Sequence, residues 1–355
     1  MTDNAASGMQ EREPSPRIIH TAAPVRICDI GGWTDTWFAK YGSVVNIAVT
    51  PRVEVLLSVY PRHRQKYHIK IHSNFLGDLY LPGKTDKPDE RFHMVRIILT
   101  HAVIPHTVAM DVQIQSHAPP GSAVGTSAAV AVALIGALEQ FHSRSINPQS
   151  IAYKAHETET VLLKGQSGIQ DQLCCAYGGI NFIEITEYSR AIVHPLKISP
   201  GIFSELEERL ALICLGTAHN SSSIHEKVIA DVESRGPEYE PLRQLRLAAI
   251  DARDALLTGD LQKFGYAMRR NTEAQSQLHP DLVSKEALKI ISIAQKYDSP
   301  GWKVNGAGGE GGSLTLLAPD SANKNLTMLH EIQSDLPNSK YIPVIIDREG
   351  LRVRE

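Results

Sequence analysis

A run of small and polar residues, Pro119-Pro120-Gly121-Ser122-Ala123-Val124-Gly125-Thr126-Ser127-Ala128-Ala129, leads directly into the apolar stretch Val130 to Leu138. Glycines let a backbone come close to a ligand, and the N-terminus of a helix offers unpaired N–H groups and a positive dipole end. The run therefore predicts a phosphate-binding loop ahead of a buried helix over Thr126 to His142. It matches neither the P-loop pattern nor the dinucleotide pattern. An ordinary loop that caps a buried helix would have a similar composition.

The overall composition is that of a soluble globular protein. The 355 residues are enough for two cores, with 42% hydrophobic and 21% charged residues. A net charge of −3 provides no basic field for nucleic acid or an anionic membrane. No apolar stretch approaches the ~20 residues that span a bilayer. Residues 1–15 lack the apolar region of a signal peptide, and we expect them to form a disordered leader.

The cysteine pattern predicts a cytoplasmic protein with reduced thiols. The four cysteines are Cys28, Cys174, Cys175 and Cys214, and none of them forms a C-x-x-C pair. An adjacent pair suits neither an ordinary disulfide nor a zinc site. We therefore expect four free thiols.

Hydrophobic periodicity predicts strands and helices in both halves of the chain, which indicates an α+β protein. A second unit is expected to begin near Leu196, and residues 77–92 are expected to form a loop. The predicted strands are Arg17–Ala22, Val44–Val49, Val53–Val59, Tyr67–His72, Val108–Ile114, Ile180–Ile185, Arg209–Leu215, Ser313–Leu317 and Tyr341–Ile346. The other predicted helices are Met94–Ala102, Ile151–Lys164, Ile224–Glu233, Pro241–Leu257, Leu261–Gln277, Ser284–Lys296 and Asn323–Ser334.

A second motif combines an aromatic residue with a carboxylate. It reads Ala23-Pro24-Val25-Arg26-Ile27-Cys28-Asp29-Ile30-Gly31-Gly32-Trp33-Thr34-Asp35-Thr36. The face of Trp33 can pack on the C–H groups of a sugar, and Asp35 can accept hydrogen bonds from its hydroxyl groups. A turn with a core tryptophan would have the same sequence.

A third motif presents another carboxylate from a tight loop. It reads Gly165-Gln166-Ser167-Gly168-Ile169-Gln170-Asp171-Gln172, and Glu159 lies twelve positions before Asp171. Glu159 follows Ile151 and Ala155 at a spacing of four on the predicted helix, so its carboxylate lies among apolar neighbours and needs a partner. A structural turn is the alternative interpretation of the loop.

Two further segments have glycine or hydroxyl groups at strand ends. The first, which we call the third glycine loop, is Lys303-Val304-Asn305-Gly306-Ala307-Gly308-Gly309-Glu310-Gly311-Gly312. We expect Glu310 to point outward, and the alternative is that it contacts the sugar. The second is Thr217-Ala218-His219-Asn220-Ser221-Ser222-Ser223, followed by His225. The second segment would also serve as the N-cap region of a helix.

The segments 23–36, 119–129 and 303–312, in this order along the chain, resemble the three motifs of the GHMP kinases, a superfamily that includes galactokinase, homoserine kinase and mevalonate kinase. The resemblance extends over residues 17–346. It departs slightly in the phosphate loop, with Ala123 in place of glycine, Val124 in place of leucine and Thr126 in place of serine. It departs also at Gly32-Trp33, where galactokinases have Glu-His, and at Glu310, where glycine is usual. The resemblance implies a two-domain α+β fold. Residues 16–195 would form an N-terminal domain like ribosomal protein S5 domain 2, and residues 196–355 a ferredoxin-like α/β sandwich.

The resemblance also implies an activity and its residues. The chain would transfer the γ-phosphoryl group of ATP to the anomeric C1 hydroxyl of a sugar or sugar phosphate, with Mg²⁺. Asp171 would accept the hydroxyl proton, and Arg26 would hold Asp171 ionised. Residues 120–127 would bind the phosphates, and Ser127 and Glu159 would bind Mg²⁺. The sugar would contact Trp33, Thr34, Asp35, His219, Gly306 and Gly308.

The motifs indicate two different acceptors. The second motif is similar to that of L-fucokinases, whereas Ala176-Tyr177-Gly178-Gly179 is similar to kinases of D-glycero-D-manno-heptose 7-phosphate. A 7-phosphate needs a basic pocket, for which Lys303, Arg269 and Arg270 are available. Two further candidate functions are a kinase for another small alcohol and a catalytically silent ATP and sugar sensor. We expect a small-molecule sugar as partner, no nucleic acid or membrane, and a monomer or homodimer.

Overall fold

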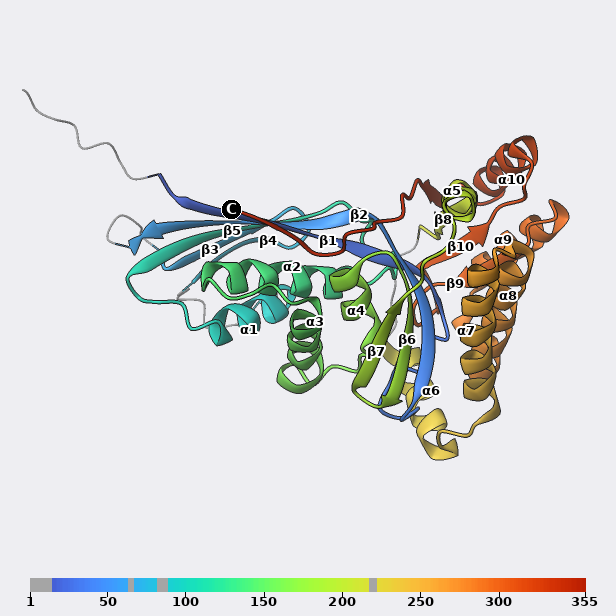
Figure 1. Cartoon of the computed structure of the whole chain (residues 1–355), viewed down its shortest axis with the longest axis horizontal. Coiled ribbons are helices and arrows are strands. Elements are labelled where there is room, and N and C mark those ends of the chain that lie inside the picture. Colours follow the sequence, from blue (N-terminus) through green and yellow to red (C-terminus); the bar gives the residue numbers. More distant parts are fainter. Residues whose placement is uncertain (1–14, 63–66, 82–88, 217–221) are drawn as a thin grey trace, which may run out of the picture.

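The computed structural model describes residues 15–62, 67–81, 89–216 and 222–355 (Figure 1). Within these residues an eight-stranded sheet has the order β12-β1-β2-β5-β3-β4, with β6 paired to β2 and β7 to β6. Its strands are β1 (Arg17–Ile30), β2 (Gly42–Pro61), β3 (Ile69–Ser73), β4 (Gly77–Leu81), β5 (Val108–Ser116), β6 (Ile180–Glu187), β7 (Arg190–Pro195) and β12 (Arg352–Arg354). The predicted α+β class is confirmed. The expected leader, residues 1–15, lies outside the described residues except for Ser15.

A smaller sheet has the order β11-β8-β10-β9 within the described residues. Its strands are β8 (Leu210–Cys214), β9 (Gly301–Val304), β10 (Ser313–Leu317) and β11 (Lys340–Ile342). The α-helices are α1 (His93–His101), α2 (Thr126–Phe141), α3 (Pro148–Glu157), α4 (Gln170–Tyr177), α5 (Pro200–Arg209), α6 (Ser222–Arg235), α7 (Glu240–Thr258), α8 (Leu261–Leu278), α9 (Lys285–Lys296) and α10 (Ala322–Asp335). Figure 1 shows α1 to α4 below the large sheet and α7 to α10 at the opposite end of the molecule.

The long strands β1 and β2 connect the two ends of the large sheet. Residues 53–61 of β2 pair with β5, whereas residues 42–47 pair with β6. The alternating residues Val53, Val55 and Leu57 are fully buried, as their period of two predicts. Strand β1 pairs with β2 along both of these parts. The last residues of β1 lie where the two sheets and helix α2 meet.

Helix α2 is the central buried helix. It is rich in alanine and valine, and its residues from Ala128 to Glu139 are all buried. Small side chains let the helix lie close to β1 and β2, whose apolar residues form the same core cluster. The predicted helix over Thr126 to His142 is therefore confirmed to within one residue.

Three sequence predictions about elements are wrong. Residues 77–81 form β4 rather than a loop, because they pair with β3. The predicted strand Tyr341–Ile346 is limited to β11, beyond which Ile346 makes an isolated bridge with Val49. The predicted helix Ile151–Lys164 begins at Pro148 and changes at Thr158 into a π-helix (Thr158–Leu162).

The C-terminal residues return to the first sheet. Strand β12 pairs with β1, so residues 352–354 extend the N-terminal sheet rather than the second one. Helices α7 and α8 contribute residues such as Ala249 and Phe264 to the same core cluster as α2. The predicted boundary near residue 195 stays a prediction, because the two residue ranges share this core.

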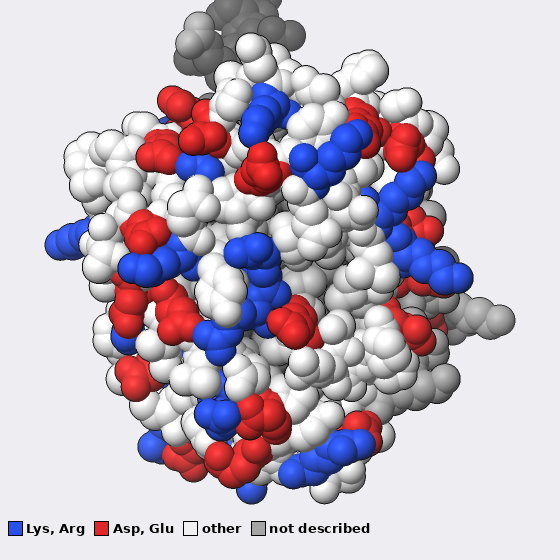
Figure 2. All heavy atoms as spheres, turned by 90° about the vertical axis from the view of Figure 1, so that its right-hand side faces the viewer, with Lys and Arg blue, Asp and Glu red and all other residues white. Residues whose placement is uncertain are grey.

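The surface formed by the C-terminal helices carries charges of both signs. Figure 2 shows Lys and Arg interspersed with Asp and Glu on this face. No helix among the described residues is both long enough and apolar enough to cross a membrane. All four cysteines are buried and free, as predicted.

Candidate active site

Residues from four segments of the sequence, 23–36, 119–129, 165–172 and 303–312, meet around one cavity of about 400 Å³, which we call the central cavity. Strand β1 brings Arg26 and Asp29 to it, and the loop between β1 and β2 brings Trp33 and Asp35. The rest of the wall comes from the phosphate loop, the start of α4 and the third glycine loop, with residues Gly121, Ser122, Ala123, Val124, Gly125, Thr126, Ser127, Gln166, Ser167, Gly168, Gln170, Asp171, Gly306 and Ala307. The fold thus brings together segments that lie up to 281 positions apart, from Arg26 to Ala307.

The phosphate loop ends in an uncapped helix N-terminus. Gly125 is the N-cap of α2 and has φ +73°, a left-handed conformation that favours glycine. No side chain caps α2, and its first turn contains no acidic residue. The first N–H groups of a helix have no partner inside it, so this end of α2 is suited to an anion. The hydroxyl of Ser122 is committed elsewhere, because it donates to the Pro119 carbonyl at 2.7 Å.

Arg26 and Asp171 form a bidentate ion pair in the wall of the cavity. Arg26 Nε donates to Asp171 Oδ1 at 2.7 Å, and Nη2 donates to Oδ2 at 3.1 Å. Arg26 is also fixed through Nη1, which donates to the Ala123 carbonyl at 2.5 Å. Burial opposes its charge, but the carboxylates of Asp171 and Asp29 outweigh burial and raise its pKa above the ordinary value. Its partner Asp171 is 23% exposed, so its carboxylate is held rigidly yet reachable from the cavity.

Gln170 joins the two carboxylates of the acceptor side. Its backbone N–H donates to Asp35 Oδ2 at 3.0 Å, and its side-chain amide donates to Asp171 Oδ1. Asn46 holds that amide in turn, because its Nδ2 donates to Gln170 Oε1 at 2.8 Å. Burial raises the pKa of Asp35 to about 6, and the nearby charge of Asp171 adds to the shift. The sequence pattern did not assign Gln170 a role, although it directly precedes Asp171.

Glycine is required at position 168 by the close approach of Asp35. A Cβ added to Gly168 would lie 2.0 Å from Asp35 Oδ2. The loop of residues 166–168 therefore lies directly on the carboxylate that the sequence predicts to bind a sugar.

A buried ion pair fastens the third glycine loop to β1. Lys303 on β9 and Asp29 on β1 are each 1% exposed, and Lys303 Nζ lies 3.4 Å from Asp29 Oδ1. Asp29 also accepts from the Gly306 N–H at 3.1 Å, and the amide of Gln275 on α8 donates to the Gly306 carbonyl at 3.2 Å. Burial lowers the pKa of Lys303 from its ordinary value. This lysine is committed to Asp29 and does not supply a basic pocket.

Trp33 is largely a core residue. It is 7% exposed and packs in a cluster with Phe38 of its own loop and Val228 of α6, while its edge reaches the cavity. Its neighbour Trp37 is more exposed and also lines the cavity, and its Nε1 donates to Glu233 at 2.6 Å. The alternative of a turn with a core tryptophan is therefore confirmed, the contact of Trp33 with a sugar stays a prediction, and the sequence pattern missed Trp37.

Glu159 lies beside the loop that bounds the cavity. Its Oε2 accepts from Gln172 Nε2 at 2.9 Å, whereas its buried Oε1 has no hydrogen-bond partner. Burial raises the pKa of Glu159 to about 7, although hydrogen bonds from Ser167 and Gln172 oppose the shift. Within the described residues, no group of three or more His, Cys, Asp or Glu is placed to hold a metal ion. A divalent cation would therefore need oxygens from a ligand as well.

A second, more apolar cavity of about 480 Å³ lies on the other side of the phosphate loop. It shares Gly121, Thr126 and Ser127 with the central cavity. Its remaining wall includes Pro120, Phe75, Leu76, Met94, Val95 and Val130. The phosphate loop thus separates a polar cavity from an apolar one.

Several predicted residues lie elsewhere. Thr34 is fully buried, and its hydroxyl donates to the Gly31 carbonyl at 2.7 Å, so it stabilises the turn instead of reaching a ligand. Gly308 does not line the cavity, and a Cβ there would lie 2.1 Å from the Leu282 carbonyl oxygen. Glu310 is exposed and lies outside the cavity wall, as expected.

The two arginines considered for a basic pocket make contacts elsewhere in the structure. Arg269 packs over the rings of Tyr266 and Trp302, and Arg270 pairs with Asp251, so neither supplies the expected basic pocket. His219 lies outside the described residues, and so does the side chain of His225.

The fold and this arrangement of motifs define a class of phosphotransferases. Residues 93–179 match the family described as the GHMP kinases N terminal domain, which includes the phosphate loop and Asp171. The chain therefore contains the GHMP kinase N-terminal domain, and over most of its length it is similar to GHMP kinases.

Individual relatives agree with this assignment. The bifunctional fucokinase/GDP-fucose pyrophosphorylase of Arabidopsis thaliana is 28% identical over 327 residues, which are 88% of this chain and 31% of that protein. The D-glycero-alpha-D-manno-heptose 7-phosphate kinase of Campylobacter jejuni is 26% identical over 317 residues, 85% of this chain and 90% of that protein. The chain thus spans less than a third of the plant protein but nearly all of the bacterial one.

A solved structure has the same fold. The D-glycero-D-manno-heptose 1-phosphate kinase from Bacteroides thetaiotaomicron superposes with a TM-score of 0.69 at 21% identity. The superposition covers 95% of this chain and 99% of that chain. The two-domain GHMP kinase fold inferred from the motifs is confirmed.

Proposed function

We propose that the protein transfers the γ-phosphoryl group of ATP to the anomeric C1 hydroxyl of a sugar. The observation that carries the proposal is the Arg26–Asp171 ion pair beside the uncapped N-terminus of α2. Phosphoryl transfer depends mainly on positioning and on neutralising charge, and these two features supply both. The names of the relatives, which are kinases of fucose and of heptose phosphates, support a sugar as acceptor.

The donor is proposed to lie across the phosphate loop. The N–H groups at the start of α2 bind the phosphates, where the helix dipole favours negative charge. The nucleoside lies in the apolar cavity, whose wall includes Met94 and Val130. The γ-phosphoryl group then enters the central cavity, which faces Asp171.

Asp171 Oδ2 is proposed to be the base. Each carboxylate oxygen accepts about two hydrogen bonds. Oδ1 already accepts from Arg26 and Gln170, whereas Oδ2 accepts only from Arg26 among the hydrogen bonds of the described residues, so Oδ2 retains a lone pair. The C1 hydroxyl gives its proton to Oδ2 as its oxygen bonds to the γ-phosphorus. The bond from that phosphorus to the β–γ bridging oxygen breaks, and ADP leaves with the electron pair.

Ser127 and Glu159 are the residues that we propose to hold Mg²⁺. Ser127 is exposed at the first turn of α2, and Glu159 has a buried carboxylate oxygen without a hydrogen-bond partner. Both are oxygen ligands of the kind that Mg²⁺ prefers, and they would hold it together with phosphate oxygens. When bound, Mg²⁺ would neutralise charge on the phosphates.

Release of ADP from Mg-ATP tests the proposal. Purified protein is assayed with L-fucose, D-galactose, D-mannose and D-glycero-D-manno-heptose with and without its 7-phosphate. ADP release that depends on one of these sugars is expected. Release no faster than with water for every sugar, while ATP still binds, would contradict the kinase and favour the silent sensor.

A further inference from the structure

A third cavity, which we call the Tyr188 cavity, adjoins the central cavity. It has a volume of about 520 Å³, within the range of small-molecule sites. Trp37 and Gln166 line both cavities, and the rest of its wall includes Tyr153, His156, Glu157 and Tyr188. A ligand in the central cavity that extends past Trp37 therefore enters the Tyr188 cavity.

The walls of this cavity are held in place by hydrogen bonds. The Tyr188 hydroxyl lies 2.9 Å from His156 Nε2 and donates to the Ser167 carbonyl at 3.2 Å. The Tyr153 oxygen accepts from the Ala191 N–H at 2.9 Å. Because Ser167 lines the central cavity, the His156–Tyr188 pair also supports the loop that separates the two cavities. The aromatic rings form a fixed surface that suits the C–H groups of a sugar.

The described side chains that line the two cavities include more carboxylates than cations. Among the described residues that line either cavity, the basic side chain is that of Arg26, which is paired with Asp171. Asp29 is paired with Lys303, so Asp35 adds the unpaired carboxyl group of the central cavity, and Glu157 adds negative charge to the Tyr188 cavity. Burial lowers the pKa of His156 to about 4, so this histidine is neutral at neutral pH. Among the described residues that line the Tyr188 cavity, a phosphate group would face the carboxylate of Glu157 and no Lys or Arg side chain.

We propose that the acceptor is an uncharged sugar whose end remote from the reacting hydroxyl lies in the Tyr188 cavity. This inference rests on the proposed function for the position of the reacting hydroxyl at Asp171. Hydroxyl groups at the remote end donate to Glu157 and pair with the Gln166 amide, and their C–H groups contact Trp37 and Tyr188. The acceptor is therefore not phosphorylated at that end before it binds.

One pair of sugars tests the inference. D-glycero-D-manno-heptose and its 7-phosphate differ only in the charged group at the remote end. We measure kcat/KM for each by ADP release, and affinity for each by tryptophan fluorescence, because Trp37 lines both cavities. The free heptose is expected to have about tenfold higher kcat/KM and to bind more tightly. Equal or better use of the 7-phosphate would overturn the inference.

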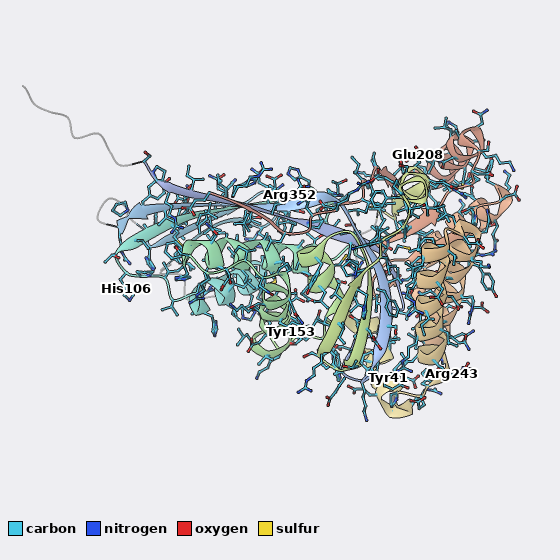
Figure 3. The ribbon with its side chains drawn as sticks, viewed as in Figure 1. Tyr41, His106, Tyr153, Glu208, Arg243 and Arg352 are labelled. Atoms are coloured by element: carbon cyan, nitrogen blue, oxygen red, sulfur yellow. The ribbon has the colours of Figure 1, made fainter. Side chains whose placement is uncertain are left out.

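A charge reversal sharpens the test. Glu157 is exposed on α3, and no hydrogen bond or ion pair of its side chain is seen among the described residues, so Glu157→Arg should preserve the fold. The variant should raise the ratio of kcat/KM for the 7-phosphate over the free heptose about fivefold. Glu208→Arg is the matched control, since Glu208 lies on α5, far from Tyr153 of the Tyr188 cavity (Figure 3). An unchanged ratio in Glu157→Arg, or an equal change in Glu208→Arg, would overturn the inference.

Binding and turnover separate this inference from the proposed function. Turnover of the 7-phosphate in preference to the free sugar would support the proposed kinase and contradict the inference of an uncharged acceptor. The free heptose could instead bind more tightly without any ADP release, with a ratio of affinities that Glu157→Arg changes. This result would support the inference and contradict the proposed kinase. Failure of both sugars to bind would overturn the inference directly.

Discussion

At the scale of single residues, Asp171 is positioned by three different parts of the chain. Arg26 from β1 holds both carboxylate oxygens, Gln170 holds one of them, and Gly125 leaves space beside the other. Such a carboxylate keeps one orientation before the acceptor arrives, which lowers the entropic cost of reaching a reactive geometry.

Replacement of the proposed base is the simplest test at this scale. Asp171→Asn should reduce kcat by ~10²–10⁴-fold, because an amide cannot accept the hydroxyl proton. The affinity for ATP, measured by calorimetry, should change little, since the phosphates contact the start of α2. Asp254→Asn, at an exposed position on α7, serves as the control. Turnover near that of the wild type would exclude Asp171 as the base.

The pKa of Asp35 predicts a pH dependence. A pKa raised to about 6 means that this carboxyl is protonated below about pH 6 and ionised above it. Only the ionised form accepts hydrogen bonds through both oxygens. The acceptor KM, measured at saturating Mg-ATP, should therefore rise as the pH falls below about 6, with less change in kcat. Asp35→Asn should remove this dependence, and its persistence in that variant would assign the titration to another group.

At the scale of elements, helix α2 links donor binding to the base. Its N-cap Gly125 turns the chain so that the first N–H groups of α2 face the cavity. A Cβ at this position would lie 3.0 Å from Asp171 Oδ2 and 3.3 Å from Arg26 Cγ. The loop conformation and the catalytic pair therefore depend on the same glycine.

A matched pair of glycine substitutions tests this dependence. Gly125→Ala should destabilise the protein by about 1–2 kcal/mol, the cost of a left-handed alanine, and should also lower kcat by displacing Asp171. Gly259→Ala is the control, because Gly259 has φ +74° at the end of α7 and its added Cβ would meet the Ile202 side chain at 3.0 Å. Unfolding curves and kcat are measured for both variants. Equal losses of kcat would mean that Gly125 acts only through stability.

At the scale of the whole molecule, the cavity depends on how the two sheets are joined. Asp29 on β1 and Lys303 on β9 form a buried pair between them, and Asp29 also holds the Gly306 N–H of the third glycine loop. The same pair therefore fixes the relative position of the sheets and closes one side of the cavity.

Removal of one partner of this pair should be costly. Lys303→Met should lower the free energy of unfolding by about 3–5 kcal/mol, because it leaves Asp29 buried without its cation. The double variant Lys303→Met/Asp29→Leu should regain much of that stability but not kcat/KM, since the Gly306 N–H loses its acceptor. Lys296→Met, which breaks the exposed pair with Glu331, should cost at most about 1 kcal/mol. Recovery of kcat/KM in the double variant would show that Asp29 is not needed to position the third glycine loop.

The sequence predicts local features of this fold well and long-range ones poorly. The helix at residues 126–142 and the glycine loops follow from residue types and spacing, which short-range physics controls. The role of Asp171 came from the resemblance instead, and Asp171 lies in the first turn of α4 rather than in the predicted tight loop. The pair of Asp29 and Lys303 joins residues 274 positions apart, so no local pattern can reveal it. The helical phasing predicted that the Glu159 carboxylate needs a partner, which Gln172 supplies, but it missed the π-helix, because a π-turn inserts one residue without changing composition.

The position of the transferred phosphoryl group tests the central claim most directly. Mg-ATP and the sugar that gives the highest rate of ADP release are incubated with the wild type and with Asp171→Asn, and the product is examined by phosphorus NMR. A phosphate signal coupled to the anomeric proton, formed by the wild type and greatly reduced with Asp171→Asn, is the predicted result. A phosphate on another carbon, or equal product from the two proteins, would contradict a sugar 1-kinase with Asp171 as its base.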